Sequence, residues 1–368
     1  MSNAPTKTAV IELLGMARDQ EHATAANLTV DEREAVGTWE HWSAKDTLSQ
    51  IAFWKHLQTG KLQAAQRGEP LPEWTSAEAV DPLNIANYVT WQRRPWAEVS
   101  AEAERAYVAL VAQVTRMSED ELADEHRAGG ALWPETLGNG IWYPFTELIR
   151  LYDRRDDAAS KARIQAAQGA ASERLLTALQ SSAHISAHTR ANTLYNTACW
   201  YALAGATERP IALLGEAFPL WRGLMVLARE DSDLNTLRGL PAFEALFAGY
   251  TDESAGQLIT RDDLRARQAA DADAPLLVDV RGPEEYAAGH IAGARNIPLD
   301  ALGGHLDELP RDRLVVTYCN HRHRGVARCE QAVELLRDNG FAARALDGGY
   351  PDWHAACLPV EAPVKAGE

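Results

Sequence analysis

One cysteine stands out because basic side chains follow it closely. Cys319 comes directly after the apolar run 314–318. The loop after it consists of Asn320, His321, Arg322, His323, Arg324 and Gly325. Positive charge and the amino-terminal end of a following helix favour a thiolate and make a cysteine nucleophilic, and the loop N–H groups suit an anion. The sequence therefore predicts Cys319 as the catalytic residue and this loop as the substrate-binding segment. The alternative is a buried structural cysteine.

The elements around Cys319 indicate an α/β domain. The runs 276–280 and 314–318 are almost continuously apolar, which is typical of buried parallel strands. Helices are predicted at 261–270 and 326–338, and Asn339-Gly340 ends the second. Because loops that follow parallel strands meet at one edge of a sheet, Cys319 is expected at a ligand-binding edge.

Three motifs in this region resemble the rhodanese family over residues 256–364. The opening motif begins Asp279-Val-Arg281, the Cys319 loop follows, and the closing motif is Leu346-Asp-Gly-Gly-Tyr-Pro-Asp-Trp353. The resemblance implies that Cys319 takes a sulfane sulfur, holds it as a persulfide and passes it to a thiol or cyanide. It also implies that Asp279 and Arg281 lie beside the site, either as a buried ion pair that orients the loop or as a solvated pair. We expect Trp353 in the core.

The loop departs from the family's usual C-x-x-G-x-R-S pattern at two positions. Arg322 stands where a Gly is usual, and Gly325 stands where a Ser is usual. The additional charge favours a small anionic donor such as thiosulfate. Cys319 and Arg324 form C-x4-R, whereas phosphatases of this fold resemble C-x5-R with a wider loop. The shorter loop predicts sulfur transfer, and a phosphatase or arsenate reductase is the last alternative.

Composition narrows the function further. The 368 residues predict two or three domains, and a net charge of −16 argues against nucleic-acid and anionic-membrane partners. Four cysteines are too few for a disulfide framework, and no apolar run is long enough to cross a bilayer, so we expect a cytoplasmic protein. We expect packing roles for Cys329 and for Cys357, which stands where the family usually has Gly; a resolving thiol is the alternative for Cys357.

The first half of the chain indicates a helical domain. Eight of the eleven tryptophans precede residue 150, which favours separately built parts. Apolar spacing predicts four helices, and hence a four-helix bundle within residues 1–182. The helices are expected at 8–20, 44–67, 86–117, and 138–154 continuing through 158–179.

The second of these helices resembles a known signature. Trp42-Ser-Ala-Lys-Asp-Thr-Leu-Ser-Gln-Ile resembles the W-S-x-K-D-x-L-x-H-I signature of DinB-like bundles, with Ser43 as the N-cap. Metal-binding members carry three His at positions that correspond here to Gln50, Tyr143 and Glu147. We therefore expect no metal and no cofactor; the alternative is a metal held by Glu147 with His41 or His56. The bundle's aromatic residues either fill its core or line a pocket for a thiol cofactor or small electrophile.

Residues 183–250 resemble the end of a tetratricopeptide array. An Ala-rich helix over 192–205 is predicted to pair with a helix over 209–229. The segment 231–246 that follows has the D-x-D-L and P-x-F spacing of the end of such an array. Fewer than two repeats of about 34 residues are present, so a peptide-binding superhelix is not expected.

These observations predict a multidomain α and α/β protein: a four-helix bundle, a tetratricopeptide-like hairpin and a rhodanese domain with a parallel sheet. Its predicted function is a rhodanese-type sulfurtransferase acting on a small anionic sulfur donor and a thiol acceptor, with helical regions that recruit a protein partner. The alternative is a rhodanese module that senses thiols or docks a partner, with any chemistry in a DinB-like bundle that binds a small molecule or acts as a thiol-dependent transferase.

Overall fold

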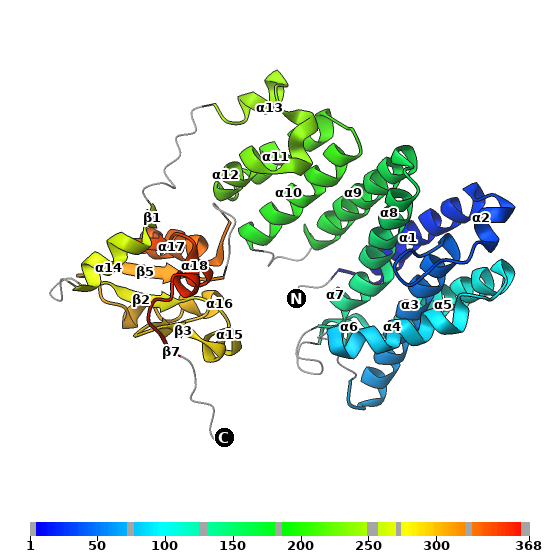
Figure 1. Cartoon of the computed structure of the whole chain (residues 1–368), viewed down its shortest axis with the longest axis horizontal. Coiled ribbons are helices and arrows are strands. Elements are labelled where there is room, and N and C mark those ends of the chain that lie inside the picture. The colour runs from blue at the N-terminus through cyan, green and yellow to red at the C-terminus, as the bar shows by residue number, and fades with distance from the viewer. Residues whose placement is uncertain are drawn as a thin grey trace. The chain divides into compact units, whose positions relative to one another are not determined.

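The computed structural model describes residues 5–71, 77–124, 131–180, 186–248, 257–269, 274–320 and 326–361. The chain divides into two compact units. The first comprises Met1–Leu220 with Asp233–Phe243, and the second comprises Trp221–Ser232 with Glu244–Glu368. The first unit is helical where it is described, and the second contains a parallel sheet (Figure 1). The predicted combination of α and α/β parts is therefore confirmed.

The helices of the N-terminal half bury a shared apolar core. Their bounds are α1 (Lys7–Asn27), α2 (Val30–Glu34), α3 (Ala44–Arg67), α4 (Ala77–Trp91), α5 (Trp96–Arg116), α6 (Glu119–Ala123), α7 (Leu132–Leu137), a π-helical turn (Gly138–Trp142), α8 (Tyr143–Arg154) and α9 (Ala158–Gln180). Leu13, Ile51, Leu110 and Phe145 are fully buried in one cluster, which joins α1, α3, α5 and α8. The core is thus built from widely separated segments.

Local sequence explains how α3 begins and ends. Ser43 Oγ accepts the backbone N–H of Asp46, and the Asp46 carboxylate accepts the N–H of Ser43 at 2.9 Å. This reciprocal cap satisfies donors that the first turn leaves open. Gly68 ends the helix with a left-handed φ of 71°. The predicted cap and the predicted bounds of this helix are confirmed.

Three predicted helices are wrong as continuous elements. The segment 86–117 is broken between α4 and α5, because Pro95 cannot continue a helix and instead occupies the N-cap of α5. The segment 138–179 starts with the π-helical turn and breaks before α9, where Asp156 has a φ of 53°. The segment 209–229 splits into α11 (Glu208–Ala217) and α12 (Gly223–Glu230).

The remaining helical segments follow the pattern more closely. α10 (Ala187–Leu203) ends just before Gly205, whose φ is 85°, as expected for an Ala-rich helix closed by a glycine. A 3-10 turn (Ser232–Leu237) and α13 (Pro241–Ala245) come after α12. Among the described residues, no helix is both long enough and apolar enough to span a membrane.

The C-terminal sheet is parallel and has the order β1-β6-β5-β2-β4. Its strands are β1 (Leu258–Ile259), β2 (Leu276–Asp279), β4 (Arg295–Asn296), β5 (Val315–Tyr318) and β6 (Ala343–Leu346). A separate antiparallel pair joins β3 (His290–Ile291) to β7 (Val360–Glu361). All four residues of β5 are buried. The two apolar runs in the sequence are therefore buried parallel strands, as predicted, and the structure makes them neighbours in the sheet.

Alternate strand residues bury opposite faces of this sheet. The helices are α14 (Arg261–Ala269), α15 (Pro283–Ala288), α16 (Leu299–Leu302), α17 (Arg328–Asp338) and α18 (Gly349–Ala355). Val315 packs in one cluster with Leu336 of α17, whereas Val316 packs in the other with Trp353 of α18, as the twofold period of a strand requires. Cys319 belongs to the α17 cluster and Tyr318 to the α18 cluster. Trp353 is a core residue, as predicted.

Candidate active site

Cys319 lies where three strands end together. β2 and β5 are in register with Asp279 opposite Tyr318, and β6 pairs with the other side of β5. The backbone N–H of Val280 continues the pairing to the carbonyl of Tyr318 at 3.1 Å. Because all three strands run in one direction, the residues that follow them meet at one edge of the sheet. This edge collects the loops that carry the three rhodanese-like motifs.

A buried ion pair forms directly beneath this edge. Asp279 is fully buried and Arg281 is 2% exposed. The Arg281 guanidinium donates to both Asp279 carboxylate oxygens, at 2.6 Å from Nη2 and at 3.0 Å from Nε. Burial alone would lower the pKa of Arg281, but the hydrogen bond and the charge of Asp279 raise it. Of the two arrangements left open by the sequence, the pair adopts the buried one.

Arg281 also joins the three motifs. Its Nη1 donates to Asn320 Oδ1 at 3.1 Å, and its Nη2 donates to the carbonyl of Gly289 at 2.7 Å. Its guanidinium carbon lies 4.3 Å from the ring centroid of Tyr350, which is a cation–π contact. The Arg281 guanidinium thus contacts the opening motif, the residue after Cys319 and the closing motif.

A second ion pair joins α15 to the first residue of α17. The Glu285 carboxylate accepts hydrogen bonds from Nη1 and Nη2 of Arg328, at 2.9 and 3.0 Å. Asn320 Nδ2 also donates to Glu285, at 2.9 Å. The hydrogen bond from Arg328 is the largest cause that lowers the pKa of Glu285 to about 2. Residues on both sides of segment 321–325 are therefore fastened to one carboxylate of α15.

Arg328 also interacts electrostatically with Cys319. The hydrogen bond with Glu285 raises the pKa of Arg328, and the charge of Cys319 raises it further. Arg328 therefore places positive charge near the Cys319 thiol.

The closing motif approaches the Cys319 backbone very closely. The N–H of Tyr350 donates to the carbonyl of Cys319 at 2.9 Å. Gly349 has a φ of 56°, and a Cβ there would overlap the carbonyl oxygen of Cys319. This position therefore requires glycine for two reasons, the left-handed backbone and the close approach.

The Cys319 side chain points toward α17 and meets a second thiol. Its Sγ lies 3.3 Å from Sγ of Cys329 in a hydrogen bond. Cys319 is fully buried, and Cys329 is 4% exposed. The hydrogen bond with Cys319, followed by burial, raises the pKa of the Cys329 thiol well above its usual value. Cys329 packs among apolar residues, as expected, but it does so in contact with Cys319.

The structure brings together only part of the predicted site. Cys319, Asn320, Asp279 and Arg281 form one cluster. The predicted substrate-binding residues His321, Arg322, His323, Arg324 and Gly325 lie outside the described residues. The sequence interpretation missed Glu285, Arg328 and Tyr350, whose contacts with the loop join residues 31 to 43 positions apart. The only signal for Glu285 was its place in the opening motif.

Gln50, Tyr143 and Glu147, the positions compared with metal ligands in the sequence analysis, lie near one another in the N-terminal half. Asn87 donates to Gln50 at 2.7 Å, Tyr143 hydrogen bonds with Gln50, and Arg150 donates to Glu147 at 2.6 Å. Burial raises the pKa of Glu147. An amide, a phenol and one carboxylate that are bonded to other side chains do not match a three-imidazole donor set.

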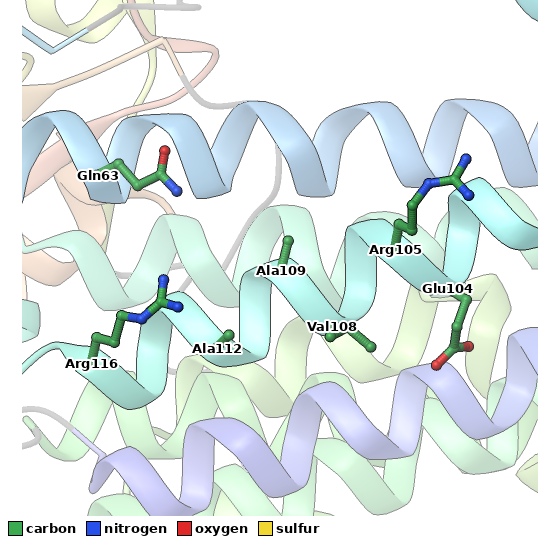
Figure 2. A pocket seen from close by; sticks show the side chains of 7 residues that line it. All are labelled: Gln63, Glu104, Arg105, Val108, Ala109, Ala112 and Arg116. Carbon is green, nitrogen blue, oxygen red and sulfur yellow. The ribbon is translucent and has the colours of Figure 1, made fainter.

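A shallow hollow of about 380 Å³ lies along α5 in the same half (Figure 2). It is lined by Gln63, Glu104, Arg105, Val108, Ala109, Ala112 and Arg116. Glu104 is engaged by Arg18 at 2.7 Å, and the lining contains no cysteine, serine or histidine. The hollow therefore offers no thiol, hydroxyl or imidazole group, whereas the edge of the sheet carries the Cys319 thiol.

Comparisons with known proteins agree with this architecture. A model of the rhodanese-like domain matches residues 260–356. A sulfurtransferase of Allochromatium vinosum is 37% identical over 99 residues, covering 27% of this chain and 89% of that protein. The chain belongs to the rhodanese-like family, which it joins through its C-terminal domain.

Two further relatives extend the comparison. An HTH-type transcriptional regulator of Mycobacterium tuberculosis is 45% identical over 113 residues, covering 30% of this chain and 48% of the regulator. The chain thus spans about half the length of that relative. The structure of a rhodanese-related protein from Thermoplasma volcanium is 30% identical, covering 28% of this chain and 97% of that one, with a TM-score of 0.25.

Proposed function

We propose that the protein is a sulfurtransferase in which Cys319 carries sulfane sulfur as a persulfide. The observation that carries the proposal is the position of Cys319 at the end of central strand β5, with Arg281 and Glu285 fixing the residue after it. The similarity to a sulfurtransferase over 89% of that protein's length supports the same reaction class. Asp279 and Arg281 act as positioning residues, because among the described residues of the loop Arg281 contacts Asn320 rather than Cys319.

The proposed reaction has two displacement steps. The Cys319 thiolate attacks the outer sulfur of thiosulfate, the S–S bond breaks, and sulfite leaves with the electron pair. A thiol or cyanide then attacks the terminal sulfur of the persulfide, and the Cys319 thiolate is released. The loop from Asn320 to Gly325 is proposed to bind the anionic donor, and Arg328 adds positive charge beside Cys319.

The spacing of the loop supports sulfur rather than phosphoryl transfer. Cys319 and Arg324 are separated by four residues. A short ring of N–H donors suits one terminal sulfur, whereas a phosphoryl group needs donors for three oxygens. We therefore expect thiosulfate to be consumed much faster than an aryl phosphate is hydrolysed.

The experiment is sulfur loading of the full chain. Thiosulfate and cyanide are supplied together, so that sulfur loaded on Cys319 meets its acceptor at once, and the chain should form thiocyanate. Cys319→Ser should abolish this transfer, because an alcohol forms no persulfide. Cys357→Ser is the matched control, since Cys357 is exposed, and it should retain most of the transfer. Thiocyanate formation by folded Cys319→Ser would contradict the proposal, as would faster aryl phosphate hydrolysis by the unchanged chain.

The helical regions are proposed to recruit the acceptor or a protein partner. In this proposal residues 1–182 form a DinB-like bundle, 183–250 a tetratricopeptide-like segment and 256–364 the rhodanese domain. The Gln50, Tyr143 and Glu147 positions are proposed to hold no metal. Elemental analysis of the purified chain tests this, and about one transition metal per chain would contradict it.

A second candidate function is thiol sensing by the rhodanese domain. The 45% identity with a transcriptional regulator favours it. A sensor would accept sulfur on Cys319 without catalytic turnover. Repeated turnover of thiosulfate with cyanide would therefore favour the transferase, whereas a single loading event per chain would favour the sensor.

A further inference from the structure

The two thiols at the sheet edge are close enough to react with each other. Sγ of Cys319 and Sγ of Cys329 are 3.3 Å apart, whereas a disulfide requires about 2.05 Å, so closure needs an approach of about 1.3 Å. Both side chains are buried in the same apolar cluster between the sheet and α17.

The backbone holds Cys329 in this position. Thr317 of β5 donates its hydroxyl to the carbonyl of Cys329 at 2.8 Å. The first turn of α17 is further fixed by Glu330, which accepts the N–H of Ala327 at 3.1 Å. Cys329 is therefore fastened to the same strand that leads to Cys319, and their separation does not depend on a long loop.

We propose that Cys329 is a resolving thiol that releases the terminal sulfur of the Cys319 persulfide as hydrosulfide. This inference rests on the proposed function, because Cys319 must first be loaded. The terminal sulfur of the persulfide anion takes the proton of Cys329, the resulting Cys329 thiolate attacks Sγ of Cys319 to form a disulfide, and the bond from Sγ to the terminal sulfur breaks. The terminal sulfur leaves with the electron pair, so it is reduced to hydrosulfide while the two cysteines are oxidised.

The proton balance uses the hydrogen of Cys329. A persulfide anion plus the Cys329 thiol gives the disulfide plus HS⁻, so charge and hydrogen are conserved. The hydrogen bond with Cys319 and burial raise the pKa of Cys329, so this sulfur keeps its proton in the unloaded pair. The disulfide is then returned to two thiols by an external dithiol reductant, which closes the cycle.

The second cysteine allows the loaded chain to release sulfide without an external acceptor. Without a resolving thiol, the loaded sulfur stays on Cys319 until an external acceptor arrives. With Cys329, the loaded chain releases one sulfide by itself and stops as a disulfide. The pair thus converts sulfane sulfur to sulfide at the expense of a dithiol reductant.

The test loads the full chain with thiosulfate in the absence of any thiol or cyanide. The unchanged chain should release close to one sulfide per loaded chain and lose about 2 Da as the disulfide forms. Cys329→Ala should gain about 32 Da, release no sulfide and still transfer its sulfur to added cyanide. Cys357→Ala is the matched control and should behave like the unchanged chain.

Peptide mapping provides a measurement that does not depend on the Cys329 variant. Trypsin cleaves after Arg322 and Arg328, so Cys319 and Cys329 fall in separate peptides. The loaded, unchanged chain should give these two peptides joined by a disulfide, and the chain incubated without donor should give them unlinked.

The outcomes separate this inference from the proposed function. A stable gain of about 32 Da on the unchanged chain, with no sulfide, would refute the role of Cys329 and leave the persulfide intact. Linked peptides at equal yield without donor would also refute it, because simple oxidation would then explain the disulfide. Failure of both the unchanged chain and folded Cys329→Ala to take up sulfur would refute the proposed function itself.

Discussion

Replacing Arg281 by Met should destabilise the rhodanese domain far more than replacing an exposed arginine of the same sheet. Arg281 is 2% exposed, and its removal leaves the fully buried Asp279 carboxylate without its guanidinium partner. Methionine keeps most of the apolar stem, so the change isolates the lost charge and hydrogen bonds. The contacts with Asn320, Gly289 and the Tyr350 ring are lost as well.

The magnitude follows from the burial of the pair. Removing one partner of a buried ion pair costs about 3–5 kcal/mol, because the other charge stays uncompensated. At about 1.4 kcal/mol per factor of ten, this corresponds to a roughly 100-fold to several-thousand-fold change in the opening equilibrium. Replacing both partners, with Asp279→Leu and Arg281→Met together, should recover part of the loss because no buried charge remains.

Amide hydrogen exchange of the full chain is the appropriate assay. Exchange in β2 and β5 reports the free energy of opening for this domain alone, whatever the helical unit does. The control is Arg295→Met in β4, whose side chain is 42% exposed and pairs with Glu308 on the surface. It should cost less than about 1 kcal/mol. Equal exchange rates for Arg281→Met and Arg295→Met would refute the reasoning.

Three further predictions concern the same domain. Because its pKa is lowered to about 2 from 4.5, Glu285 should stabilise the domain fully above pH 4.5 and lose that contribution as the pH falls toward 2. The Glu285 side chain is 37% exposed, so screening by solvent reduces its stabilising effect to about 1 kcal/mol. Glu285→Gln should remove this pH dependence of domain stability, as measured by amide hydrogen exchange in β5. Gly349→Ala should destabilise the domain by more than about 2 kcal/mol in urea unfolding, from backbone strain plus overlap with Cys319, whereas Gly303→Ala, which meets no neighbour, should not. Cys357 has a φ of 54°, and Cys357→Gly should stabilise the domain by about 0.5 kcal/mol, because the relief of left-handed backbone strain exceeds the entropy that glycine adds to the unfolded chain. An unchanged or lower melting temperature would contradict this.

The strands and the position of Cys319 could be predicted because their signals are local. Almost continuously apolar runs predicted β2 and β5, and parallel pairing placed the residue after each run at one edge. The cap of α3 was equally readable, since Ser43 and Asp46 are three residues apart.

Other features could not be predicted because they depend on contacts between distant segments. Whether Asp279 and Arg281 are buried depends on Gly289 and Asn320, which cover the guanidinium from elsewhere in the chain. The contact between Cys319 and Cys329 likewise needs the path of the chain from β5 into α17. The helix break before α5 was missed for a different reason: Pro95 and the polar run 92–94 were local signals, but the prediction followed the apolar residues on either side.

The ion pair between Glu285 and Arg328 has a consequence for how substrate preference could be redesigned. Asn320 and Arg328 flank residues 321–325, and both are fastened to Glu285. These contacts are made by residues outside the segment 321–325, which the proposed function assigns to donor binding. We therefore expect that exchanging these five positions changes donor preference while the contacts of Glu285 with Asn320 and Arg328 are retained.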